Sequence, residues 1–167
     1  MKAKAKFGGR FRVECYGPDG RLKWRDTFEN LVTNQGLQYL LDAGLLGGAQ
    51  VGTWYVGLTD GTPTVAAGDT MTSHAGWTEV TAYSEATRPA YSGSRTNQTV
   101  SNSSSKAAFS INGTATVGGA FLASDSTKGG TTGTLLCAGA FSAGDKAVGS
   151  GDTLNVQYDF SAADDGA

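Results

Sequence analysis

The chain has 167 residues, 39% of them hydrophobic and 10% aromatic, which is enough for one domain with a substantial core and excludes a largely disordered protein. Only 17% of the residues are charged, against about 25% in an average protein, and 25 glycines indicate many turns. No apolar run approaches the ~20 residues of a transmembrane helix, and no apolar segment of a secretory signal follows the first lysines. We therefore expect no membrane partner.

Charge is unevenly distributed along the chain. The first 25 residues hold eight basic and two acidic side chains, whereas residues 26–167 hold five basic and thirteen acidic ones, so the net charges are +6 and −8. A basic segment of this kind can bind an acidic protein surface, nucleic acid or a membrane, but a solvated strand face has the same composition. We expect no direct binding of nucleic acid.

The chain begins with two strands. In FGGRFRVECY (7–16), apolar Phe11, Val13 and Cys15 alternate with polar residues, which is the pattern of a half-buried strand. RLKWRDTFENLV (21–32) alternates in the same way, and the intervening GPDG has turn chemistry. Together they predict a basic N-terminal β-hairpin over residues 6–28.

One segment has helical periodicity, ENLVTNQGLQYLLDAGLLGG (29–48), and it predicts a helix over about residues 34–44. Leu37, Leu40 and Leu41 fall at positions i, i+3 and i+4. Glycines follow the periodic part, and three residues can cap its start: Asn30, Thr33 or Asn34. So short a helix is unstable alone. We therefore expect its leucine face to dock on the sheets and close one end of the fold.

The rest of the chain has the pattern of short strands separated by Gly or Asp turns. Candidate strands lie in WYVGLTD (54–60), KAAFSING (106–113), TATVGGAFLAS (114–124), GTLLCAGAF (133–141) and GDTLNVQYDFSA (151–162). Residues 84–105 form a long polar run, which we expect to be a loop held by a partner. Strands with a turn about every 10 residues predict a single all-β domain over residues 1–167, an antiparallel β-sandwich, jelly-roll-like.

A search for reaction chemistry finds no recognisable motif. The single histidine, His74, has no acidic or nucleophilic partner within TSHAGW, and we expect it to be structural. Cys15 and Cys137 are expected to be reduced and buried, and with one histidine they do not supply a zinc site. A convergent pair of acids stays open, because nothing selects two among the 15. We predict no enzyme activity, no catalytic residues, no cofactor and no metal.

The order of several sequence blocks resembles a group of small structural proteins of tailed bacteriophages. The blocks are NLVTNQGLQYLLD, WYVGLTD, GDTMTSHAGWTEVTAYSEATRPAY, GAFLAS, GGTTGTLLCAGAF and GDTLNVQYDF, and the resemblance spans roughly residues 28–161. It implies a non-enzymatic virion component, foremost a capsid decoration or cement protein, made in the host bacterial cytoplasm and located on the capsid surface. A head-to-tail or tail-associated role is the alternative. The resemblance supplies no catalytic residues.

We predict that the protein binds the major capsid protein on the outer head lattice, as a homo-oligomer, through its basic first strand and its polar run. The predicted contact residues are basic or aromatic: Lys2, Lys4, Lys6, Arg10, Arg12, Arg88, Tyr91 and Arg95. One competing hypothesis is a glycan-binding adhesin of a tail or head fibre, using Tyr83, Tyr91 and Trp77. Another is a small hydrolase with an unrecognised site.

Overall fold

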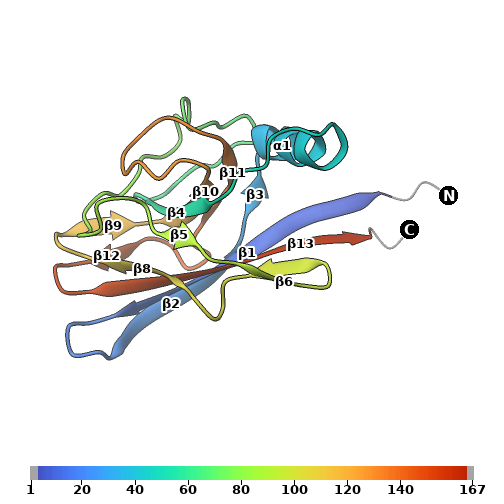
Figure 1. Ribbon diagram of the computed structural model, residues 1–167. Helices are drawn as coiled ribbons and strands as arrows, with labels where there is room; N and C mark the ends of the chain where they lie inside the picture. Colours follow the sequence, from blue (N-terminus) through green and yellow to red (C-terminus); the bar gives the residue numbers. More distant parts are fainter. Residues whose placement is uncertain (1–3, 165–167) are drawn as a thin grey trace.

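Two antiparallel β-sheets lie face to face in the computed structural model, which describes residues 4–164 (Figure 1). The strands of the first sheet are β1 (Ala5–Tyr16), β2 (Leu22–Glu29), β6 (Ser94–Thr96), β7 (Thr99–Ser101), β8 (Ala107–Ser110) and β13 (Thr153–Asp164). Those of the second are β3 (Leu31–Val32), β4 (Trp54–Thr59), β5 (Ala90–Tyr91), β10 (Gly119–Ala123) and β11 (Leu135–Ala140). The remaining elements are β9 (Ala115–Val117), β12 (Lys146–Val148) and helix α1 (Asn34–Leu45). The predicted all-β, sandwich-like fold with one helix is confirmed for the described residues.

The order of the strands places the two ends of the described chain side by side. The first sheet runs β2-β1-β13-β7-β6, with β8 paired to the first half of β13. The second sheet runs β3-β11-β10-β4-β5, while β9 and β12 form a separate pair. Figure 1 shows β1 and β13 extending together beyond the rest of the sandwich, toward the N- and C-terminal ends. The first and last strands therefore form one antiparallel ribbon.

The main core lies between the sheets and follows the alternation of the sequence. Phe11, Val13 and Cys15 of β1 are fully buried, and so are alternate residues of β13, Leu154 and Val156 among them. From the second sheet they meet inward side chains of β4 and β10. Burial of this apolar area is the main stabilising contribution. The predicted N-terminal hairpin is also confirmed, with β1 and β2 in antiparallel register.

The second sheet is buried on its other face as well. There Phe121 and Leu135 pack against Met71 and Trp77, which come from the irregular segment between β4 and β5. The ring of Trp77 is 4% exposed, and its Nε1–H donates to the carboxylate of Asp69 at 3.0 Å. This long connection therefore acts as a third layer over the second sheet.

Helix α1 docks by its first turn and by Leu40, and not by the whole of its predicted leucine face. Thr33 caps the helix, accepting the Gly36 N–H at 3.0 Å, and its hydroxyl donates to the carbonyl oxygen of Leu135 at 2.6 Å. Leu37 and Leu41 are 37% and 54% exposed. The prediction that the leucine face closes the sandwich is therefore wrong for these two residues. The contact is made where a β-bulge in β11 presents backbone carbonyls to the capping residue.

Residues 84–105 are not one long loop, which corrects the prediction from the sequence. They contain β5, β6 and β7, and the β6–β7 hairpin continues the first sheet past β13. Asn102 is buried beyond this hairpin, where its side chain donates to the Val156 carbonyl at 3.1 Å and accepts the Tyr158 N–H at 2.7 Å. Bonds within the chain hold this segment, so it does not need a partner to become ordered.

The described chain offers no membrane span of helical type. Its helix, α1, has 12 residues, and an apolar helix that crosses a bilayer needs about 20.

Candidate partner-binding face

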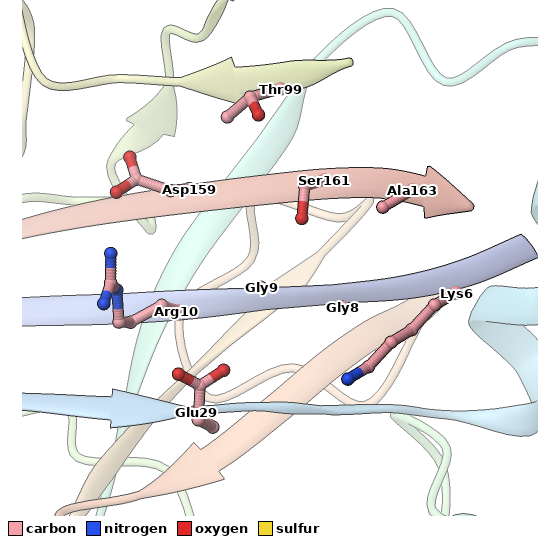
Figure 2. A pocket seen from close by; sticks show the side chains of 9 residues that line it. All are labelled: Lys6, Gly8, Gly9, Arg10, Glu29, Thr99, Asp159, Ser161 and Ala163. Atoms are coloured by element: carbon pink, nitrogen blue, oxygen red, sulfur yellow. The ribbon is translucent and has the colours of Figure 1, made fainter. Parts of the chain in front are cut away.

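The outer face of the first sheet carries a groove of about 480 Å³ (Figure 2). Figure 2 shows Gly8 and Gly9 of β1 between the longer side chains of Lys6 and Arg10. The other lining residues come from the neighbouring strands: Glu29 of β2, Thr99 of β7, and Asp159, Ser161 and Ala163 of β13. The groove is therefore lined by four neighbouring strands, β2, β1, β13 and β7, which come from three separate parts of the sequence.

Strand periodicity determines which side chains reach this face. Phe11 and Val13 point into the core, so Lys6, Gly8 and Arg10 point outward. The register places Gly8 opposite Ser161. The hollow lies where these small residues meet, and the longer side chains rise at its ends. A Cβ added to Gly8 would meet no atom within 4 Å, so this glycine leaves open space above the sheet.

Gly9, by contrast, is required by the packing below the groove. A Cβ at this position would lie 2.5 Å from the hydroxyl of Tyr158, which accepts a hydrogen bond from the Asn30 amide at 3.1 Å. The sulfur of Cys137 also donates to this hydroxyl, at 3.3 Å. Gly9 therefore allows β1 to lie directly over a buried polar group, while Gly8 shapes the outer surface.

The cations of this face form no close ion pair within residues 4–164, where the four ion pairs involve other basic groups. Glu29 and Asp159 stand opposite Arg10 across the neighbouring strands, and the charge of Arg12 acts on the Glu14 carboxyl. Asp159 already accepts the Ser101 hydroxyl at 2.5 Å and the Gln157 amide at 3.0 Å. The cations are therefore available to an anionic partner.

The outward side chains of β1 beyond Arg12 are no longer all basic, because Glu14 comes next on this face. Glu14 binds the Nζ of Lys106 at 2.8 Å, and this hydrogen bond lowers the pKa of the Glu14 carboxyl although partial burial acts in the opposite direction. At the other end, Lys4 lines a neighbouring groove of about 420 Å³ together with Gln98 and Asp164. Lys2 lies outside the described residues.

The predicted contact residues of the polar run do not join this face. Arg88 has no exposed side-chain surface and forms an ion pair with Glu79, so its prediction as a surface contact is wrong. The Tyr91 hydroxyl donates internally, to the Val100 and Tyr158 carbonyls at 3.2 and 2.9 Å. Arg95 is exposed on β6 but lines neither groove.

The three aromatic residues considered for glycan binding are not brought together. Tyr83 is fully buried against Phe109, and Trp77 is buried on the far face of the second sheet. Tyr91 lines a cavity of about 140 Å³ between α1 and the sheets. Its other lining residues are apolar or aromatic: Tyr39, Leu40, Trp54, Val100, Leu122, Leu136, Tyr158 and Phe160. An aromatic platform made of the predicted trio is therefore excluded in this fold.

The histidine and the two cysteines that were considered for catalysis or metal binding are packed against other residues of the fold. The ring of His74 stacks on Trp77 at a centroid distance of 3.9 Å, and its Nδ1 lies 2.9 Å from the Trp77 carbonyl oxygen. Cys15 and Cys137 are free and buried, as predicted. Within the described part of the chain, no group of three or more His, Cys, Asp or Glu side chains is arranged to hold a metal ion.

Comparison with known proteins adds no relative. A scan of family models, a search of curated proteins and a search of solved structures each gave no match to this chain. What the fold and the face define is an all-β, sandwich-like protein with an exposed, grooved sheet surface on which basic and acidic side chains lie side by side. Sequence reasoning selected Lys6 and Arg10 on this surface but missed Glu29, Asp159 and Ser161.

Proposed function

We propose that this protein is a non-enzymatic structural component of a tailed-bacteriophage virion, a capsid decoration or cement protein that binds the outer head lattice through the grooved face of its first sheet. The observation that carries this proposal is a row of cations on β1, Lys6, Arg10 and Arg12, on an exposed sheet surface, none of which forms an ion pair within residues 4–164. The resemblance of the sequence blocks to phage structural proteins supports the class of partner.

The physical basis of attachment is charge complementarity on a preformed surface. The β1–β13 ladder fixes the backbone that carries the outward cations, so little backbone freedom is lost on binding, and the ordering cost falls on the Lys and Arg side chains. Positive charge of this kind increases the association rate and excludes basic partners more than it adds raw affinity. Attachment to an acidic lattice should therefore weaken with salt, because the Debye length falls from about 10 Å at 0.1 M to about 3 Å at 1 M.

The test is reconstitution on capsids that lack the protein, with bound copies counted by quantitative gel analysis. Arg10→Gln combined with Arg12→Gln should reduce occupancy at least tenfold. The matched control is Arg21→Gln combined with Arg95→Gln, which removes the same charge from exposed positions outside the groove. Full occupancy by the Arg10 and Arg12 variant, or equal loss by the control, would contradict attachment through this face.

A glycan-binding adhesin of a tail or head fibre is the second candidate, and the cavity beneath α1 is the observation that favours it. Its walls include the partly exposed rings of Tyr39, Trp54 and Tyr91, residue types that stack on sugars. Electron microscopy of virions with labelled protein separates the candidates. Label over the whole head supports the decoration protein, and label confined to tails or fibres supports the adhesin.

A further inference from the structure

One edge of β1 has no partner strand near the N-terminal end of the described chain. Residues 5–9 pair with β13 on one side, but the pairing with β2 ends where Arg10 lies opposite Glu29. After Glu29 the chain leaves the first sheet and pairs with β11 of the second sheet as β3. No strand of residues 4–164 therefore pairs with the other edge of β1 over residues 5–8.

The backbone groups at this edge are oriented to accept another strand. The N–H of Asn30 donates to the Gly9 carbonyl at 3.1 Å, which shows that the backbone groups of Gly9 face the side of β2. Because successive residues of a strand alternate, the N–H and C=O of Ala5 and Phe7 face the same side. These groups lie beyond the end of β2; β3 contacts β1 but is paired with β11 of the second sheet.

The side chains along this edge favour a particular partner. Gly8 stands on the outer face between Lys6 and Arg10, and the groove over it opens next to the end of β2. In an added strand, the residue opposite Gly8 would project on the same outer face. Its side chain would then lie between Lys6 and Arg10, and Gly8 has no side chain that would obstruct it. An acidic side chain of this residue would lie within reach of both cations; Arg10 also has Glu29 opposite it on β2, so Lys6 would gain most from the added charge.

We propose that the free edge of β1, residues 5–8, binds an extended acidic segment of a partner protein by strand addition, with one carboxylate over Gly8 between Lys6 and Arg10. Main-chain bonds to Ala5 and Phe7 supply affinity, and the groove supplies side-chain selectivity. On the opposite face the ring of Phe7 is 39% exposed and stacks on Phe160 at 6.4 Å, so the partner strand also finds apolar surface.

Charge decides between an acidic partner and a second copy of this chain. Pairing of β1 with the same edge of another copy would bring Lys6 and Arg10 of both copies together, and like charges on neighbouring strands are destabilising. Lysines on an edge strand oppose unspecific pairing for the same reason. The basic residues therefore exclude self-association at this edge and select an acidic strand.

The experiment uses the whole protein and two synthetic probes, a short peptide in which glutamate alternates with valine and its lysine counterpart. Binding is measured by titration, and amide hydrogen exchange is followed at Ala5 and Phe7. The glutamate peptide should bind saturably and slow exchange at both amides, and the lysine peptide should not. Absence of saturable binding by the glutamate peptide, or equal binding by the lysine peptide, would overturn the proposal.

Two substitutions at one position isolate the backbone contribution. Phe7→Pro removes the N–H that faces the open edge but no bond to β13, so the fold should persist. Phe7→Ala removes the same ring and keeps the N–H. The glutamate peptide should bind Phe7→Pro at least tenfold more weakly than Phe7→Ala, with unchanged circular dichroism for both. Equal binding by the two variants would show that no strand is added.

This inference deepens the proposed attachment face, but its failure is distinguishable from failure of the capsid proposal. Peptide binding that depends on the Phe7 N–H, together with full capsid occupancy by the Arg10 and Arg12 variant, would keep strand addition and reject the capsid lattice as the partner. Lost capsid occupancy by that variant without peptide binding would keep the attachment face and reject strand addition.

Discussion

Arg88 and Glu79 form a buried, bidentate ion pair. Nε of Arg88 lies 2.9 Å from Oε1 of Glu79, and Nη2 lies 2.7 Å from Oε2. The guanidinium also donates to the carbonyl oxygens of Asp125 and Gly130, at 2.8 and 2.7 Å, and stands 5.2 Å from the centre of the Phe121 ring. One side chain thus connects the irregular layer to the loop between β10 and β11.

Replacing Arg88 with alanine should destabilise the protein by about 3–5 kcal/mol, because the substitution leaves the Glu79 carboxylate buried without its cation. Urea unfolding measures the change. Arg95→Ala, at an exposed position on β6, is the control and should stay within about 0.5 kcal/mol of wild type. Similar unfolding midpoints for the two variants would contradict a structural role for the ion pair.

Two glycines of α1 should respond to alanine in opposite directions. A Cβ at Gly36 would lie 2.3 Å from the Leu136 carbonyl oxygen, so Gly36→Ala must displace the helix from the β11 bulge and lower stability. A Cβ at Gly44 would meet no atom within 4 Å, and Gly44→Ala should raise stability by about 0.5–1 kcal/mol through helix propensity. Thermal unfolding of both variants checks this. Stabilisation by both would mean that α1 is not held at Gly36.

The leucines of α1 should differ according to what they touch. Leu40 packs against the main core and lines the cavity below the helix, so Leu40→Ala should cost about 2 kcal/mol, near the low end of the range for core leucines. Leu41 is 54% exposed, and Leu41→Ala should change the unfolding free energy by less than about 0.5 kcal/mol. Equal losses would indicate that Leu41 is covered in solution.

Neither cysteine should react while the protein is folded. Burial raises the pKa of Cys15 to about 11 and that of Cys137 to about 12, and the thiolate is the reactive form. At pH 8 a thiol reagent should therefore label both cysteines at the rate of unfolding, and denaturant should accelerate the reaction. Fast stoichiometric labelling without denaturant would contradict the buried positions.

Stability should fall in acid, in part through Glu14. Its pKa in the folded protein is lowered by the hydrogen bond from Lys106, so the stabilisation is complete above the unfolded-state pKa of about 4.3 and is lost as the pH falls through the folded-state value. Lys106→Met should reduce stability at pH 6 by about 1 kcal/mol or less, since the pair is near the surface. The difference from wild type should vanish once the pH is below the folded-state pKa of Glu14. A difference that is constant with pH would assign the loss to packing of the Lys106 stem.

The long alternating strands could be predicted from the sequence because one of their faces lies in the core. The burial of Phe11, Val13, Leu154 and Val156 follows directly from a period of two. Strands β5, β6, β7 and β12 have only two or three residues, too few to show a period of two, so their pairing depends on neighbours that the local sequence does not reveal. For the same reason residues 84–105 have the pattern of a loop.

Residues of the grooved face could be predicted from the sequence only where the alternation of polar and apolar residues along a strand shows which side chains are exposed. Lys6 and Arg10 are such positions. The groove between them depends on the register that sets Gly8 opposite Ser161, which is a property of paired strands and not of either strand alone. The consecutive glycines of FGGR were the available signal, since glycine weakens a strand and often marks a close approach or a hollow. Nothing near Arg88 in the sequence indicates that it is buried with Glu79.

The central place of β13 has a consequence for the order of events during synthesis. β13 pairs with β1 on one edge and with β7 and β8 on the other, yet the ribosome makes it after every other described strand. A nascent chain that ends before β13 has all strands of the second sheet but lacks the middle of the first. It also lacks Asp159 and Ser161, which form one wall of the groove. Only chains extended through β13 present the complete face, so truncated products cannot compete for its partner.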